Sequence, residues 1–136
     1  MDLDQARQFL AANHRSVLIT YRADGTAQPS PVVHGVDDQG RIAVSTREPA
    51  YKVRALRRNP RTTLCAFTDN FYGQWVVVNG TAEIISLPDA MQPLVELYRQ
   101  IRGEHPDWDE YRAAMERERR VIVAITPTSA GPDRQG

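Results

Sequence analysis

The sequence predicts one α+β domain built on a β-barrel, with helices packed around it. Six segments rich in β-branched and apolar residues are separated by turn residues such as Asp24-Gly25, a strong hairpin signal. Segments with helical spacing lie among the strands, and a last apolar segment returns as a strand. Hairpins followed by helices and a returning strand are typical of an α+β barrel domain. A length of 136 residues suits one such domain.

Each element has its own local signal. The first helix, over residues 2–14, spaces its apolar residues as a helix does, and either Asp2 or Asp4 can cap it. Strands are expected at residues 16–22, 27–37, 41–46, 62–68, 74–86 and 121–128. Further helices are expected at residues 48–59, 89–101 and 109–120. We therefore assign residues 1–128 to the barrel domain and residues 129–136 to a disordered tail.

The second predicted strand contains two prolines, Pro29 and Pro31. Proline has no backbone N–H group to donate to a neighbouring strand. The first half of this strand is therefore expected at the edge of a sheet or at a bulge.

Composition excludes several classes of function. The chain has 17 basic and 17 acidic residues, and this balance argues against nucleic acid or a membrane surface as the partner. The single cysteine, Cys65, allows neither an internal disulfide nor a cysteine-rich metal site. The N-terminus lacks the pattern of a signal peptide, and the apolar runs are too short to span a bilayer. We therefore expect a cytoplasmic protein.

Positive charge is concentrated in residues 45–61, "STREPAYKVRALRRNPR", which hold six of the 17 basic residues and a single acid, Glu48. Lys52 is the only lysine of the chain. Four arginines recur at i, i+3, i+4 and i+7 and are expected to share one helix face: Arg54, Arg57, Arg58 and Arg61. That face is either solvated and paired with acidic residues elsewhere, or it binds an anion.

The start of the helix in this segment predicts an anion site. Pro49 is expected near the first helical position, where its missing N–H costs nothing, although Ser45 and Glu48 also have the spacing of a capping box. In both cases Ser45 and Thr46 present hydroxyl groups beside a helix N-terminus, whose free N–H groups attract anions. Lys52 adds a compact ammonium that suits contact with a phosphate.

Four stretches of the chain resemble the split β-barrel flavoproteins related to pyridoxine 5′-phosphate oxidase, and more narrowly their actinobacterial branch that binds coenzyme F420, a 5-deazaflavin. These stretches are "RADGTAQPSPV", "STREPAYKVRALRRNPR", "VNGTAEI" and "GEHPDWDEYRAAMERERRVIVAITP", which occur in this order over most of the chain. The resemblance implies a six-stranded antiparallel barrel of the FMN-binding split-barrel type with flanking helices. It also implies a homodimer with the cofactor in a groove at the subunit interface.

The resemblance also assigns cofactor-binding residues. Ser45, Thr46 and Lys52 correspond to the positions that hold the cofactor phosphate in the family. Another three, Gln74, Trp75 and Val76, correspond to the segment that lines the ring, although the loop "TDNFYGQ" before them departs from the family pattern. Ala50 stands where some relatives have a second phosphate-binding arginine, and Arg47 or Arg54 can substitute for it. The tail "TPTSAGP" lacks the aromatic-glycine ending common in the family.

The remaining candidates have a structural and a functional interpretation. His34 is either a half-buried strand histidine or a polar contact to ring or substrate, and Trp75 either packs or stacks on the ring. The segment "HPDWDEYR" is explained by a capping aspartate and packing aromatic residues. The three histidines have no metal-ligand spacing, and no nucleophile motif or phosphate-binding glycine loop is present.

The resulting hypothesis is a coenzyme F420-dependent oxidoreductase that transfers a hydride to a small conjugated substrate. The cofactor carries the chemistry, which agrees with the lack of a catalytic triad or acid pair. Two alternatives remain: an FMN-dependent oxidoreductase of the same fold, and a non-catalytic protein that binds coenzyme F420. The sequence assigns no catalytic residue, no metal and no substrate identity.

Overall fold

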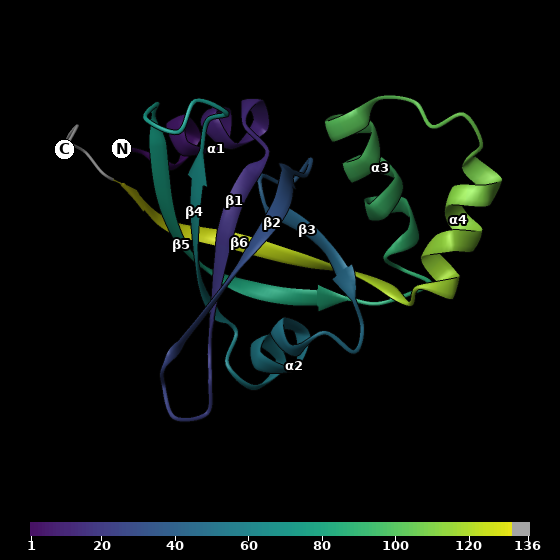
Figure 1. The fold of residues 1–136 in the computed structure, drawn as a ribbon, viewed down its shortest axis with the longest axis horizontal. Helices are drawn as coiled ribbons and strands as arrows, with labels where there is room; N and C mark the ends of the chain where they lie inside the picture. The colour runs from purple at the N-terminus through teal and green to yellow at the C-terminus, as the bar shows by residue number, and fades with distance from the viewer. Residues whose placement is uncertain (132–136) are drawn as a thin grey trace.

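The computed structural model describes residues 1–131 as a closed antiparallel β-barrel with four helices. The strands lie around the barrel in the order β1-β2-β3-β6-β5-β4. Figure 1 shows α1 at one end of the barrel, α2 near the other, and α3 with α4 as a hairpin on one side. The elements are α1 (Leu3–Ala12), β1 (Arg15–Tyr21), β2 (Ala27–Val36), β3 (Ile42–Arg47), α2 (Tyr51–Arg58), β4 (Arg61–Phe67), β5 (Trp75–Ile85), α3 (Met91–Arg102), α4 (Trp108–Arg117) and β6 (Arg120–Gly131). The split β-barrel expectation is confirmed.

Two apolar clusters hold the domain together. The first fills the barrel and includes the inward side chains of the strands together with Phe9 and Leu10 of α1 and Leu56 of α2. The second lies outside the barrel, where Leu94 and Leu97 of α3 pack against β3 and β6. The helix hairpin is therefore attached to the barrel by its own core.

Helix α1 begins as expected, because Asp2 accepts from the backbone N–H of Gln5 and completes a capping box with it.

The prolines of β2 lie at an edge, as predicted. Residues 27–33 of β2 pair with β1, whereas the ladder between β2 and β3 begins only at His34, opposite Val44. On its other side, β3 pairs with β6 from Ile42 to Arg47. The first half of β2 and the last half of β3 are thus unpaired with each other, and the barrel wall is open between them.

Three expectations about element ends are wrong. Strand β6 continues to Gly131 and pairs there with β5, so residues 129–131 belong to the barrel and not to a tail. Residues 132–136 of the expected tail lie outside the described residues. Helix α2 begins at Tyr51 with Ala50 as its N-cap, so Pro49 precedes the helix. Arg61 is the first residue of β4, because the helix ends before Asn59-Pro60.

Candidate functional site

A groove with a volume of about 620 Å³ lies between the open part of the barrel wall and the α3–α4 hairpin. This volume is in the range of sites that hold cofactors and other small molecules. Strands β2, β3 and β6, helix α2 and the hairpin all contribute to it. Its lining residues are Pro31, Val32, Val33, Ser45, Thr46, Lys52, Leu94, Leu97, Tyr98, Arg102, Tyr111, Met115 and Arg120.

The groove brings together Ser45, Thr46 and Lys52, the residues predicted to hold a phosphate. Ser45 and Thr46 end β3, and the short connection that follows leads directly into α2, where Lys52 is the second residue. Within residues 1–131, neither hydroxyl group forms a hydrogen bond, and Lys52 forms no hydrogen bond or ion pair. All three polar groups are therefore available to a ligand.

Lys52 and Arg120 make this end of the groove electrically positive. Lys52 is half-buried, and burial, followed by the nearby charge of Arg120, lowers its pKa from the usual value of 10.5. The Glu118 carboxylate pairs with Arg120 at 2.8 Å. Lys52 has no such carboxylate among residues 1–131, so its positive charge is not compensated. Among the described residues, the lining includes three cationic side chains and no acidic one. A bound anion would offset the cost of burying the Lys52 charge and would weaken the repulsion between Lys52 and Arg120.

The N-terminus of α2 adds unused backbone donors. No side chain caps this helix, because its N-cap is Ala50. The capping-box alternative for Ser45 and Glu48 is therefore wrong, and the Glu48 carboxylate instead pairs with Arg57 and accepts from the Ser86 hydroxyl. Free N–H groups in the first turn of a helix favour an anion, and here they accompany Lys52.

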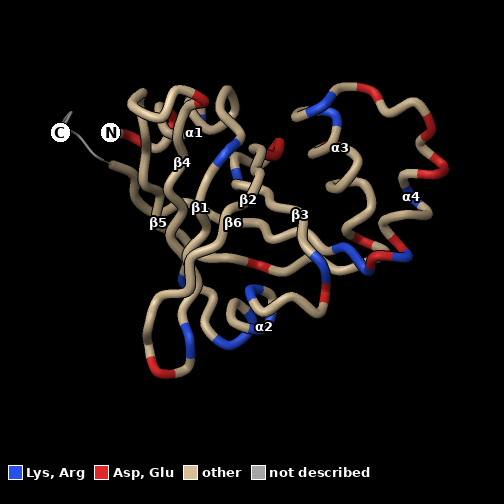
Figure 2. Tube along the Cα trace, viewed as in Figure 1, with Lys and Arg blue, Asp and Glu red and all other residues tan. Residues whose placement is uncertain are grey.

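The arginines of the basic segment do not form a second anion site on one face. Figure 2 shows basic positions spread along α2. Arg57 pairs with Glu48, and Arg58 donates to the backbone carbonyl of Tyr21. Arg61 lies over the Tyr21 ring at 4.3 Å from its centroid. The paired and solvated interpretation fits these residues, since their charges already have partners or face water.

The three residues predicted to line the ring lie outside the groove of their own chain. Trp75 is the first residue of β5 and Gln74 precedes it; Trp75 is 41% exposed and pairs with Phe67 of β4. The Val76 side chain is fully buried in the barrel core. None of the three lines the groove within one chain.

His34 is a core residue and does not face the groove. Its side chain is fully buried, with Nδ1 2.8 Å from the Ser16 hydroxyl and Nε2 3.1 Å from the carbonyl oxygen of Leu10. The carbonyl can only accept, so Nε2 carries the proton and Nδ1 accepts from Ser16. Burial is the main cause that lowers the pKa of His34 to about 4. These contacts favour the structural interpretation of this histidine, although the side chain is fully buried and not half-buried as expected.

The α3–α4 wall holds groove residues that the sequence did not suggest. Tyr98 and Arg102 of α3, Tyr111 of α4 and Arg120 of β6 all line the groove. The rings of Tyr98, His105, Trp108 and Tyr111 pack together with centroids 5.1–5.7 Å apart. The packing interpretation of "HPDWDEYR" is thus confirmed, and Asp107 caps α4 as expected. The one available signal was the i, i+4 spacing of Tyr98 and Arg102 on a helix face.

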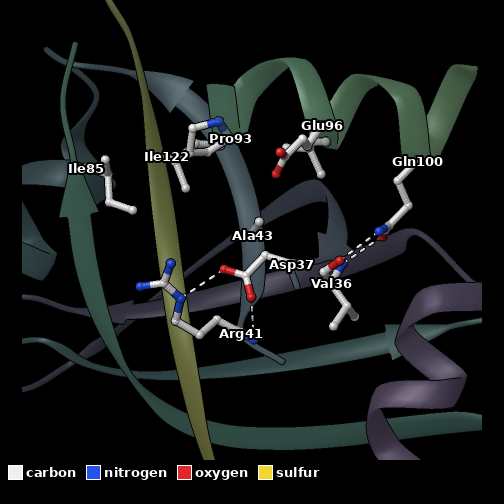
Figure 3. A pocket seen from close by; sticks show the side chains of 10 residues that line it. Val36, Asp37, Arg41, Ala43, Ile85, Pro93, Glu96, Gln100 and Ile122 are labelled. Atoms are coloured by element: carbon white, nitrogen blue, oxygen red, sulfur yellow. Dashed lines mark hydrogen bonds and ion pairs between the residues drawn. The ribbon is translucent and has the colours of Figure 1, made fainter. Parts of the chain in front are cut away.

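A second hollow, shown in Figure 3, is too small and too well paired to be a ligand site. It has a volume of about 40 Å³ between α3 and the β2–β3 turn. The Gln100 side chain there pairs with both the N–H and the carbonyl of Val36 at 2.7 Å. The Asp37 carboxylate accepts from the Arg41 guanidinium at 2.8 Å. The Gln100 contacts attach α3 to the barrel, and the Asp37–Arg41 pair lies within the β2–β3 turn.

Within the described part of the chain, no three His, Cys, Asp or Glu side chains gather as metal ligands. Across residues 1–131, no helix is both long and apolar enough to cross a membrane.

Fold and groove together define a six-stranded split β-barrel whose wall opens onto a site for a small molecule. The chain belongs to the pyridoxamine 5′-phosphate oxidase family, whose sequence profile matches residues 3–131. The fold of this family is one that binds flavin-type cofactors.

Solved structures share the fold at low sequence identity. A conserved hypothetical protein from Mycobacterium tuberculosis superposes with a TM-score of 0.78 at 24% identity, covering 96% of this chain and 82% of that one. An F420 reductase gives 0.71 at 21% identity, covering 92% and 94%. The haem storage protein of Vibrio cholerae gives 0.71 at 14% identity, covering 96% and 94%. The same fold therefore occurs in proteins with different ligands.

Proposed function

We propose that this protein is a cytoplasmic homodimer that uses coenzyme F420 to transfer a hydride to a small, electron-poor conjugated C=C or C=N bond. The observation that carries the proposal is the meeting of Ser45, Thr46 and Lys52 in one groove, to which the described part of the chain contributes no acidic side chain. Family membership and the likeness to an F420 reductase support an oxidoreductase. The proposal assigns no substrate identity.

The residues of the groove fit a ribityl phosphate cofactor. Among residues 1–131, Lys52 is a half-buried cation without a hydrogen-bond or ion-pair partner, and the hydroxyls of Ser45 and Thr46 are also free. Apolar side chains from α3 and α4, among them Leu97 and Met115, offer a dry surface to a planar ring. When bound, the deazaflavin supplies the hydride. The protein binds the cofactor, orients it and excludes water, which requires no nucleophile of its own.

A dimer would complete this site. The groove is open on one side, and the chain exposes several large apolar residues, which often mark an interface. They are Val33, Tyr51, Phe71, Tyr72 and Trp75. Under this proposal Gln74 and Trp75 contact the ring bound by the partner, while Val76 acts only as core packing beneath them.

Two alternatives share the same groove. FMN has a similar ring and the same ribityl phosphate, so Lys52 would serve it equally well. A non-catalytic protein would bind coenzyme F420 without turnover. Haem is less favoured, because the lining contains no histidine or cysteine among residues 1–131 and leaves Met115 or a tyrosine as the iron ligand.

The proposal is tested by titrating the purified protein with coenzyme F420, FMN and haem, followed by quenching of tryptophan fluorescence. We expect coenzyme F420 to bind most tightly. Reduced cofactor is then mixed without oxygen with conjugated acceptors, and its oxidation is followed by absorbance. Binding without oxidation by any acceptor favours the non-catalytic alternative, and yellow purified protein with bound FMN favours the flavin alternative. Binding of haem alone contradicts the proposal.

A further inference from the structure

Glu48, the single acid of residues 45–61, has a carboxylate that is held at both oxygens. Oε1 accepts from the Arg57 guanidinium, and Oε2 accepts from the Ser86 hydroxyl at 3.3 Å. Arg57 also donates to the Ser86 hydroxyl oxygen at 3.3 Å, so the three side chains form a closed set of contacts. The hydrogen bond from Arg57 is the main cause that lowers the pKa of Glu48 from the usual 4.5, and the carboxylate is therefore charged at neutral pH.

The backbone of Glu48 is held as well. Its N–H donates to the carbonyl oxygen of Arg119 at 2.8 Å. Arg119 lies between α4 and β6 and has a φ of 53°, a left-handed conformation that is uncommon for any residue except glycine. Such a conformation persists where the surrounding contacts impose it. The bond from Glu48 is one of these contacts, and it joins the β3–α2 connection to the end of the α3–α4 hairpin.

The contacts of Glu48 reach three different parts of the fold. They come from α2, from the connection between β5 and α3, and from the turn between α4 and β6. Glu48 itself follows Thr46 by two residues and precedes Lys52 by four. The chain between the hydroxyl groups of the groove and its lysine is therefore fixed at one residue to the barrel, to α2 and to the hairpin.

Glu48 does not line the groove. It lines a separate hollow of about 180 Å³ together with Ser86 and Arg119, and Arg120 lines both the hollow and the groove. By its charge alone, an acid so near a site for an anion would weaken binding of that anion. A favourable effect of Glu48 on the site therefore has to come from its position in the chain and from its contacts.

We propose that Glu48 is a positioning residue, which holds the β3–α2 connection in the arrangement that lets the two groove hydroxyls and Lys52 bind the same phosphate. The inference rests on the proposed function in taking this corner for the cofactor phosphate. Several donors act together on one anion only when each is held within about 0.5 Å of the productive geometry. Loss of the contacts of Glu48 should therefore weaken the phosphate part of the cofactor affinity and leave the ring part unchanged.

The test uses two matched pairs of ligands, which differ within each pair by the phosphate. One pair is coenzyme F420 and the same deazaflavin without its phosphate, and the other is FMN and riboflavin. Calorimetry measures their affinities for the wild type, Glu48→Gln and Ser86→Ala, and urea unfolding checks that each variant is folded. We expect Glu48→Gln to weaken both phosphate ligands about tenfold and Ser86→Ala about threefold, the loss of a charged and of a neutral hydrogen bond. The two ligands without phosphate should bind as before.

Ser86 gives the sharpest form of this test. It is uncharged and lies outside the groove, so its substitution changes neither the net charge nor any side chain that lines the groove. Ser86→Thr keeps the hydroxyl group and should restore the affinity of the wild type. Arg57→Ala leaves the Ser86 hydroxyl and the Arg119 carbonyl in contact with Glu48, and should cost less than Glu48→Gln.

The matched control for charge is Glu110→Gln. It removes a carboxylate of α4 that pairs with Arg117 at 3.0 Å and does not line the groove. Because it also takes one negative charge from the protein, it measures the effect of charge alone, which should be no change or a slight gain in affinity for the phosphate ligands.

The outcomes separate positioning from the proposed function. Equal losses for ligands with and without phosphate would overturn the positioning role, because a general loosening of the fold affects both. Unchanged or tighter phosphate binding in Glu48→Gln, as in Glu110→Gln, would overturn it too, and so would a wild type whose affinity gains nothing from the phosphate. A protein that binds FMN but not coenzyme F420, or that binds coenzyme F420 without turnover, contradicts the proposed function, while phosphate-specific losses in Glu48→Gln and Ser86→Ala still support the positioning role.

Discussion

The Ser16 hydroxyl lies 2.8 Å from Nδ1 of His34, and both side chains are buried in the domain. With the Leu10 carbonyl at Nε2, this contact gives the neutral imidazole a partner at each nitrogen. Protonating Nδ1 would turn the Ser16 hydroxyl into the acceptor and would place a positive charge in the core, which burial disfavours. The histidine is therefore kept neutral by its surroundings.

We predict that His34 makes the stability depend on pH. The pKa of His34 is lowered to about 4 in the folded protein, from the usual 6.5. Above pH 6.5 His34 is neutral in both the folded and the unfolded state. As the pH falls below 6.5, His34 becomes protonated in the unfolded state but stays neutral in the folded state. Stability should therefore fall by about 2–3 kcal/mol between pH 7 and pH 4.5 and stop falling on this account below pH 4. Urea unfolding at several pH values measures it.

His34→Gln is the matched variant for this prediction, because its amide can still donate to the Leu10 carbonyl. It should be less stable than the wild type at pH 7 and should lose less stability on acidification. Identical pH profiles for the two proteins would show that other groups cause the acid sensitivity.

A second prediction concerns assembly. If the partner subunit closes the groove, the protein should sediment at micromolar concentration as a dimer of 15.3 kDa chains. Phe71 and Tyr72, which are 83% and 92% exposed, are the first residues to test by substitution with serine. A wild type that sediments as a monomer in the presence of cofactor argues against a shared site.

Trp75 provides a third prediction that depends on the second copy. Trp75→Ala should remove most of the quenching that accompanies cofactor binding and weaken affinity by about 1 kcal/mol, because the indole would lose its contact with the ring. Trp108, the other tryptophan, packs on Tyr98 and Tyr111 in the groove wall, so Trp108→Phe measures the quenching that arises within one chain. Unchanged quenching in Trp75→Ala would limit Trp75 to packing.

Gly80 provides a prediction on the fold alone. It lies where the register between β5 and β6 shifts, and a Cβ there would meet the Thr126 backbone carbonyl oxygen at 2.5 Å. Because that atom belongs to a paired strand, Gly80→Ala should lower the free energy of unfolding by about 1–3 kcal/mol. The control is Gly25→Ala, which adds a Cβ in open space and therefore measures only the cost of a positive φ. Equal stability of Gly80→Ala and the wild type in urea would be the contrary result.

The sequence predicted local structure well and long-range structure less well. The strands, the Asp2 cap and the edge position of Pro29 and Pro31 follow from side-chain type and from proline's missing donor, which are local properties. Arg61 was placed on the face of α2 because its i+7 spacing fits a helix, whereas the helix ends before Asn59-Pro60 and Arg61 begins β4. The extension of β6 was missed because its pairing with β5 is a contact between distant segments.

In the candidate site, too, the residues grouped by local sequence were predicted and those brought together by long-range folding were not. Ser45, Thr46 and Lys52 are eight residues or fewer apart, so a strand followed by a helix start was enough to group them. Arg102 and Arg120 reach the groove only because α3 and β6 fold back onto β3, which no local pattern encodes. Trp75 lies outside the groove of its own chain, so its proposed contact with the ring requires the proposed dimer.

The central claim is that Lys52 holds a cofactor phosphate, and the most direct test measures how tightly Lys52→Ala binds coenzyme F420 and the same deazaflavin without its phosphate. The variant should fold normally and bind coenzyme F420 more weakly by about 1.5–3 kcal/mol, the usual range for a charged hydrogen bond, with little change for the truncated ligand. Arg57→Ala, which removes a cation already paired with Glu48, should cost much less. An equal loss for both ligands in Lys52→Ala, or a loss with Arg57→Ala alone, would contradict the claim.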